Sequence, residues 1–169
     1  MQVRLAQARD AEAIREIYNH EVLTGTATFD LRPRTTDEQH TWLASHLGPY
    51  PAVVAEEPSG AVAGFGSLSP FRERPAYNTT VENSVYVSVD HQRRGVGKAI
   101  LVELVRLGRE GGFHTIIARI GGHNEASIAL HAACGFVEVG VEREVGRKFG
   151  QWLDVVVMQA MLDSPPARP

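Results

Sequence analysis

Apolar positions along the first fifty residues follow the spacing of a short strand and two helices. The run from Val3 to Leu5 indicates a strand, and the helical spacing of apolar residues after Asp10 indicates a helix that this aspartate caps. Thr36 and Asp37 are candidate caps of a second helix, whose apolar stripe includes Leu43. Both helices are therefore expected ahead of the main sheet.

From residue 52 onward the pattern changes to apolar runs separated by turns or by helical spacing. The expected strands are 52–55, 61–68, 80–89, 114–120, 137–145 and 152–161, and the expected helices begin at Val96 and after Asn124. Turns at 58–60 and 146–150 join the first and the last of these strand pairs. With the N-terminal elements, this order gives seven candidate strands and four candidate helices.

Composition narrows the class of protein. The chain has 169 residues, 43% hydrophobic and 22% charged, which is typical of one globular domain; we expect it over residues 1–163, with a disordered tail at 164–169. The formal net charge of −3 argues against nucleic acid as a partner. The chain shows neither a signal sequence nor an apolar run of about 20 residues, so a cytoplasmic protein that does not bind membranes is expected.

Other sources of catalytic chemistry find no support in the sequence. The seven histidines show no HExxH or paired spacing and Cys134 is the single cysteine, so we expect no metal site and no internal disulfide. There is no G-x-S-x-G elbow. Cys134, next to Gly135 at a helix end, fits a packed small residue better than a nucleophile.

The most informative segment is a glycine-containing turn, Gln92 to Lys98, that follows a strand and opens a helix. Free N–H groups at a helix N-terminus suit a phosphate, glycine lets it approach, and three basic residues add positive charge. A P-loop would need glycine at position 92 and serine or threonine at position 99, where this chain has Gln92 and Ala99. A dinucleotide fingerprint would need glycine or alanine at position 100, where it has Ile100. Taken alone, the turn also fits a helix start that merely carries two glycines.

Two motifs in the chain resemble signatures of the GNAT family of N-acetyltransferases. Gln92 to Gly97 resembles the pyrophosphate-binding pattern, and Asn124 to His131, followed by Gly135 and Phe136, resembles the second signature. The resemblance implies acetyl-CoA as co-substrate, bound by Val85, Tyr86, Val87, Arg93, Arg94, Gly95, Val96, Gly97, Lys98 and Asn124. It also implies an α/β fold: a mixed, mostly antiparallel sheet of six or seven strands, flanked by about four helices and split where residues 81–89 and 114–120 run parallel.

Three further segments narrow the resemblance to one branch of that family. Ile17 to His20, Thr80 to Val87 and Lys148 to Asp154 resemble the phosphinothricin and methionine sulfoximine N-acetyltransferases, and the likeness covers about residues 3 to 162. It implies direct transfer of acetyl to the α-amine of phosphinothricin, methionine sulfoximine, methionine sulfone or a similar amino acid. It also implies a homodimer and a role in antibiotic or herbicide resistance. Two alternatives stay open: an acetyltransferase for a protein N-terminus or lysine, and a CoA-binding module without catalysis.

Acetyl transfer to an amine needs a base, since an ammonium must lose a proton before its nitrogen attacks a thioester. Alternation along the strand places Glu82, Ser84 and Tyr86 on one face, unless a bulge shifts the period. Glu82 is the candidate base, acting directly or through water with a pKa raised by partial burial. A backbone N–H of the same strand is the expected oxyanion donor. Taken alone, Glu82 also fits a solvated carboxylate.

His131 stands where most of the superfamily carries a tyrosine that protonates the departing thiolate. The resemblance therefore makes His131 a second catalytic candidate. A histidine titrates near neutral pH, so it can act as that acid or as the base. A helix histidine that is merely fixed by a hydrogen bond is the third possibility.

The resemblance also implies a substrate site. The polar loop from Phe71 to Asn78 contacts substrate in the resembling enzymes, and an arginine fork suits a carboxylate or a phosphinate. The residues expected to bind substrate are Phe29, Arg72, Glu73, Arg74, Tyr77, Asn83 and Ser84. On composition alone, the loop also fits a solvated basic segment.

Overall fold

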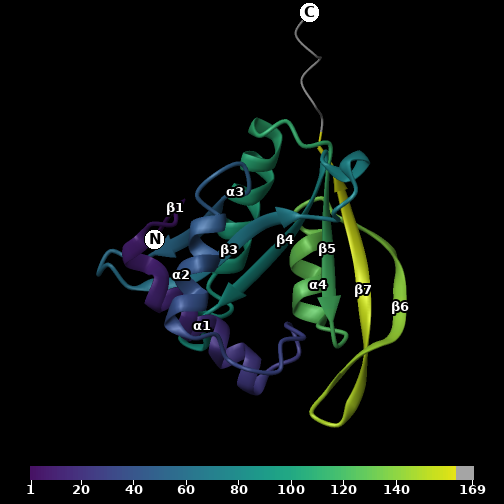
Figure 1. Cartoon of the computed structure of the whole chain (residues 1–169), viewed down its shortest axis with the longest axis horizontal. Helices are drawn as coiled ribbons and strands as arrows, with labels where there is room; N and C mark the ends of the chain where they lie inside the picture. Colours follow the sequence, from purple (N-terminus) through teal and green to yellow (C-terminus); the bar gives the residue numbers. More distant parts are fainter. Residues whose placement is uncertain (163–169) are drawn as a thin grey trace, which may run out of the picture.

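A computed structural model describes residues 1–162, which form seven strands and four α-helices (Figure 1). The strands are β1 (Gln2–Leu5), β2 (Ala52–Glu56), β3 (Val62–Pro70), β4 (Thr80–Val87), β5 (Thr115–Gly121), β6 (Val137–Lys148) and β7 (Gln151–Met161). The helices are α1 (Ala11–Thr24), α2 (Thr36–Ser45), α3 (Val96–Glu110) and α4 (Glu125–Ala132). No helix in residues 1–162 is long and apolar enough to cross a bilayer. The predicted boundary at 163 and the predicted tail at 164–169 lie outside the described residues.

All seven strands belong to one sheet, in the order β1-β2-β3-β4-β5-β7-β6. β4 and β5 run parallel, and the other five neighbouring pairs are antiparallel. The parallel pairing joins residues 80–83 to 115–118, and both strands then continue apart. The sheet therefore opens into a fork beyond Asn83 and Ala118. This arrangement confirms the predicted α/β fold, with a mostly antiparallel sheet split at one parallel pair.

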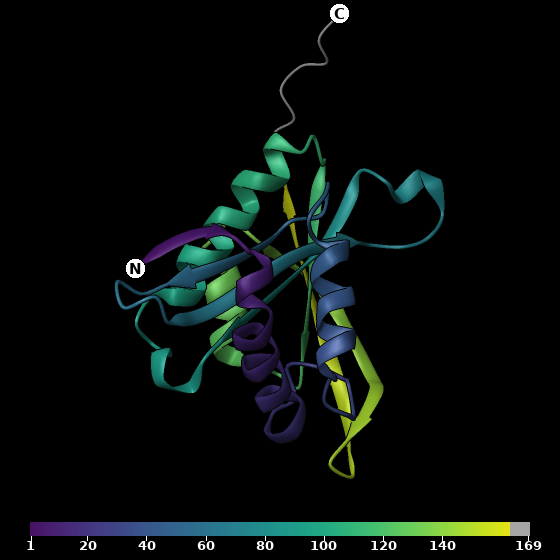
Figure 2. The ribbon, with the colours of Figure 1, turned by 60° about the vertical axis from the view of Figure 1, so that its left-hand side comes forward.

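Helices cover both faces of the sheet (Figures 1 and 2). On one face α1 and α2 pack on the strands through a cluster that includes Ile14, Leu43 and Phe65. On the other face α3, with α4 beside it, packs through Ile100 and Leu104. All five side chains are buried, and burial of one such side chain contributes roughly 1.5–3 kcal/mol. Packing on both faces thus holds the strands in place on either side of the fork.

The starts of the first two helices differ from the sequence prediction. Asp10 precedes α1, but its carboxylate accepts hydrogen bonds from Arg4 at 2.7 and 2.9 Å and does not cap the helix. α2 is capped by Thr35, one residue before the predicted caps. The Thr35 hydroxyl accepts from the Glu38 N–H, and the Glu38 carboxylate accepts from the Thr35 N–H. This reciprocal capping box satisfies two backbone donors, whereas a single cap satisfies one.

Several strand boundaries differ from the prediction, and those of β4 and β6 bear on the site. β4 ends at Val87, because residues 89–91 form a 3₁₀ turn that leads into the glycine turn. β6 continues to Lys148, so the turn of the last hairpin is Phe149 and Gly150, with φ of 50° and 76°, and not 146–150. Gly146 therefore lies inside a strand.

Candidate active site

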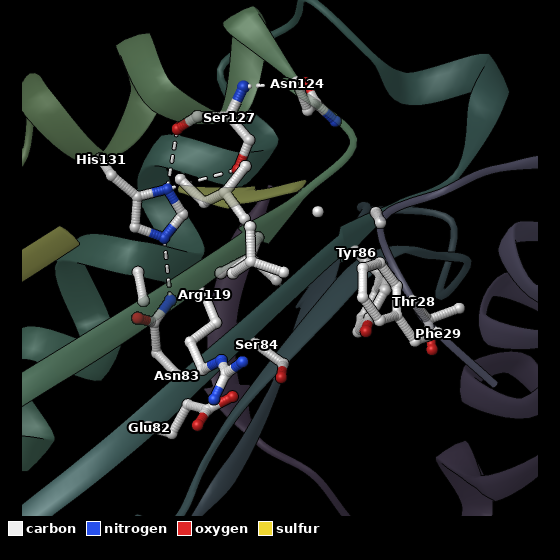
Figure 3. A pocket seen from close by; sticks show the side chains of 16 residues that line it. Thr28, Phe29, Glu82, Asn83, Ser84, Tyr86, Arg119, Asn124, Ser127 and His131 are labelled. Carbon is white, nitrogen blue, oxygen red and sulfur yellow. Dashed lines mark hydrogen bonds between the residues drawn. The ribbon is translucent and has the colours of Figure 1, made fainter. Parts of the chain in front are cut away.

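A pocket of about 360 Å³ lies in the fork between β4 and β5 (Figure 3). Its walls come from both strands, from α4 and from the segment after α1. The lining residues are Ala27, Thr28, Phe29, Glu82, Asn83, Ser84, Val85, Tyr86, Ala118, Arg119, Ile120, Gly121, Asn124, Ser127, His131 and Val155. Beyond Asn83 the edge of β4 away from β3 pairs with no strand of residues 1–162, so its backbone N–H groups are free to donate to a ligand.

The glycine turn follows β4 and opens α3, as the sequence predicts. Gly95 is the N-cap residue with φ 82°, a left-handed conformation that glycine adopts without strain. No side chain of the described residues caps α3, so the N–H groups of its first turn and the helix dipole favour an anion. An added Cβ at Gly97 would lie 3.1 Å from a leucine of α4, so this glycine also allows the two helices to approach. Arg93, Arg94 and Lys98 stand exposed around the turn.

Glu82 lies toward the start of β4, away from the glycine turn. Partial burial raises the pKa of its carboxyl group above the usual value; Arg119 on β5 opposes this shift and Glu142 on β6 supports it. In Figure 3 the side chains of Glu82 and Arg119 point toward each other, and the Arg119 guanidinium pairs with Glu142. A carboxylate whose pKa is moved toward neutrality has the property that a general base needs.

His131 projects from α4 into the fork and uses both ring nitrogens in hydrogen bonds. A carbonyl oxygen only accepts, so Nδ1 donates to the Ser127 carbonyl at 2.7 Å, and Nε2 accepts from Asn83 Nδ2 at 3.0 Å (Figure 3). The residue is 3% exposed, and burial lowers the pKa of the ring. His131 is therefore held neutral and tied to β4 at the residue where β4 and β5 part.

The structure brings several predicted residues together in this pocket. Both catalytic candidates, Glu82 and His131, line it. The predicted acetyl-CoA residues that line it are Val85, Tyr86 and Asn124, and the predicted substrate residues that line it are Phe29, Asn83 and Ser84. The β3–β4 ladder keeps continuous register from residue 81 to residue 87, so no bulge breaks the predicted alternation along this pair.

Other predicted residues lie elsewhere. Val87 and the turn residues Arg93 to Lys98 continue from the pocket along β4 to the start of α3. Arg72, Glu73, Arg74 and Tyr77 are in the β3–β4 loop, which projects from the body of the chain (Figure 2) and does not line the pocket. Their role in substrate binding stays a prediction.

Some pocket residues were not predicted from the sequence. Arg119 is the single charged residue of β5, and a lone arginine in an otherwise apolar strand is a signal in the sequence for a site. Thr28 precedes Phe29, and Ser127 lies one helical turn before His131. No three His, Cys, Asp or Glu side chains of residues 1–162 are grouped to hold a metal ion. The pocket thus offers a carboxylate and free backbone donors, next to an anion-binding turn.

Comparisons with known proteins agree with this geometry. A family model described as an acetyltransferase (GNAT) domain matches residues 3–157. The L-methionine sulfoximine/L-methionine sulfone acetyltransferase of Salmonella typhimurium is 41% identical over 168 residues, which are 99% of this chain and 98% of that protein.

Solved structures show the same fold. A phosphinothricin acetyltransferase of the GNAT superfamily from Sinorhizobium meliloti, in complex with AcCoA, is 41% identical, with a TM-score of 0.94 over 99% of this chain and 92% of that one. A ribosomal-protein-alanine N-acetyltransferase from Brucella melitensis is 37% identical, with a TM-score of 0.93 over 96% and 100%. With a family match along nearly its whole length and a pocket at the fork of the sheet, the chain belongs to the GNAT acetyltransferases.

Proposed function

We propose that this chain transfers the acetyl group of acetyl-CoA to the α-amine of a small amino-acid-like substrate. The pocket in the fork carries the proposal, because it holds a carboxylate of raised pKa and adjoins the open N-terminus of α3. That N-terminus suits the pyrophosphate of coenzyme A. Relatives named for methionine sulfoximine, methionine sulfone and phosphinothricin support the class of acceptor. If the chain has a role in resistance, it would act by acetylating the free amine of such a compound.

In the proposed reaction the amine attacks the thioester carbonyl directly, and no acyl-enzyme forms. Glu82 takes the proton that the amine loses, either directly or through a water molecule. A free N–H of β4 donates to the oxyanion of the tetrahedral intermediate. Collapse of that intermediate breaks the C–S bond, and the departing thiolate is protonated by the Glu82 carboxyl group or by water.

His131 takes no proton in this proposal. Its Nδ1–H is used by Ser127 and its Nε2 lone pair by Asn83, so neither nitrogen is open to the thiolate or the amine. Instead, the ring links α4 to β4 at the base of the fork. The acid and base roles implied by the family resemblance make different predictions for variants of this residue.

Substrate class is tested by offering the protein acetyl-CoA with a panel of acceptors and measuring released coenzyme A. We expect turnover of methionine sulfone, methionine sulfoximine or phosphinothricin, and kcat/KM for peptides lower by about a hundredfold or more, because a pocket of about 360 Å³ suits a small acceptor. N-acetylmethionine sulfone is the matched control, since its amine is already blocked.

Protein acetylation is the second candidate, since one similar structure is named as a ribosomal-protein-alanine N-acetyltransferase. Turnover of peptides beginning with alanine, without turnover of any free amino acid, would replace the proposed function with this one. Binding of acetyl-CoA without any turnover would instead indicate a module without catalysis.

We also propose that the chain forms a homodimer. Apolar side chains exposed on the edge strand β6 and the adjoining β7 support this: Val137, Val139, Val141 and Trp152. Light scattering after size exclusion should give about twice the 18.5 kDa of one chain. A mass of one chain at micromolar concentration would contradict the proposal.

A further inference from the structure

The aromatic ring of Phe29 forms one wall of the pocket and rests on two glycines from distant strands. A Cβ added at Gly146 would lie 2.1 Å from Phe29 Cε2 and 2.5 Å from Cδ2. A Cβ added at Gly121 would lie 2.7 Å from Cε1 of the same ring. Neither glycine is left-handed, so Gly146 is needed to leave room for the ring, and Gly121 to leave room for the ring and for the Thr26 carbonyl oxygen, which would also lie 2.7 Å from the added Cβ.

Gly146 reaches Phe29 because β6 bulges beside it. The register of β6 on β7 shifts between Glu142 and Gly146, and Glu144 within the shift is left-handed with φ 52°. Asp154 on β7 holds this bulge, since its Oδ1 accepts from the Glu144 N–H at 2.8 Å. The backbone carbonyl of Asp154 also accepts from the Gly122 N–H at 3.0 Å, which ties the bulge to the end of β5.

Lys148 holds the residue before Phe29. Its side chain is 4% exposed, and its Nζ donates to the Thr28 carbonyl oxygen at 2.8 Å. None of residues 1–162 offers it a carboxylate within 4 Å, and burial lowers its pKa. Burying an ammonium without an ion pair within 4 Å costs free energy, and the side-chain contact that Lys148 makes there is its hydrogen bond to the Thr28 backbone.

We propose that the end of the last hairpin is a specificity-determining element of the acceptor site, in which Gly146, Lys148 and Asp154 fix the position of Thr28 and Phe29. We call these three residues the hairpin seat. None of the three lines the pocket, so they act on the acceptor through the wall that they hold. The inference rests on the proposed function, because it assumes that an acceptor binds beside Phe29. The proposal assigns a role to the segment from Lys148 to Asp154, which takes no part in the transfer reaction itself.

Gly146→Ala tests the seat directly. The new methyl group displaces the Phe29 ring, so KM for the acceptor should rise about tenfold while KM for acetyl-CoA stays within about twofold. Gly140→Ala is the matched control on the same strand, since a Cβ there meets nothing within 4 Å, and it should leave both constants unchanged.

A double-mutant cycle with Phe29→Ala separates the seat from a general disturbance of β6. Without the ring there is nothing to displace, so Gly146→Ala should change the acceptor KM by less than about twofold in the Phe29→Ala background. An equal rise in both backgrounds, or an acceptor KM in Gly146→Ala that matches Gly140→Ala, would overturn the proposal.

Lys148→Met is the second variant, and it decides the question if Gly146→Ala does not fold. It keeps the length of the side chain and removes the hydrogen bond to Thr28, so the acceptor KM should rise several-fold, with KM for acetyl-CoA unchanged. A wild-type acceptor KM in Lys148→Met contradicts the role proposed for the hairpin seat.

If the wild-type protein acetylates no amino acid, the proposed function fails, and the hairpin seat is then tested by thermal unfolding. Gly146→Ala should lower Tm when Phe29 is present and leave it unchanged in Phe29→Ala.

Discussion

Replacing Glu82 with glutamine is expected to lower kcat by about a hundredfold or more, the usual scale for loss of a general base. Glutamine keeps the shape of the side chain in the pocket but cannot accept the proton of the amine. Glu82 lies away from the glycine turn, so the affinity for acetyl-CoA, measured by titration calorimetry, should stay within about twofold. Wild-type kcat in this variant would remove Glu82 from the mechanism.

The pH dependence of kcat/KM provides a finer test of the same residue. Activity should rise with pH as the Glu82 carboxyl group ionises, and burial places this limb above the usual range of a glutamate pKa. Glu142→Gln is the control variant, because Glu142 does not line the pocket but its charge raises the pKa of Glu82. In that variant the acid limb should move to lower pH, with kcat near wild type at pH 8. A limb that stays in place would mean that another group titrates.

The parts of this chain that follow from local sequence could be predicted, and the parts that depend on distant strands could not. The glycine turn is local: position 95 has a left-handed conformation that favours glycine, and the start of the helix after it supplies free N–H donors for an anion. The bulge that presents Gly146 depends on a hydrogen bond from Glu144 to Asp154 on the next strand, and nothing near Gly146 in the sequence marks it. A glycine followed by Arg147 and Lys148 therefore favoured a turn over the strand that forms.

The same distinction applies to the candidate site. Glu82 could be named because alternation along one strand and the family resemblance agree. The hydrogen bond between His131 and Asn83 joins residues 48 positions apart, so the sequence left three roles open for the histidine. Arg119 is marked in the sequence as the single charged residue of an apolar strand, but its pairing with Glu142 on β6 could not be inferred from that. Contacts between elements far apart in the sequence decide these cases, and sequence periodicity carries no information on them.

Replacement of His131 distinguishes a positioning residue from an acid or a base. His131→Ala removes the acceptor for Asn83 Nδ2, so a buried amide loses its partner, and we expect a loss of about 1–3 kcal/mol in the free energy of unfolding. Because β4 is then no longer held at the fork, kcat should fall by about tenfold to a hundredfold. In His131→Gln, the amide oxygen can accept the same hydrogen bond without titrating, so kcat should stay within about threefold of wild type with an unchanged pH profile. An acid or base role predicts instead that both variants lose about a hundredfold or more.

Stability as a function of pH gives an independent measure of the same residue. The folded-state pKa of His131 lies below its unfolded value of 6.5, so the unfolded chain binds more protons as the pH falls through 6.5. The free energy of unfolding should therefore decrease below about pH 6.5, and the decrease continues until the pH reaches the lowered pKa. His46, whose pKa is also lowered by burial, contributes in the same direction. His131→Gln loses the share from His131 and keeps those of His46 and the other shifted groups, so urea unfolding at pH 7 and pH 5.5 should show a smaller difference than in the wild type. Equal differences would mean that His131 is not held neutral in the folded state, and the ring would then be available as an acid.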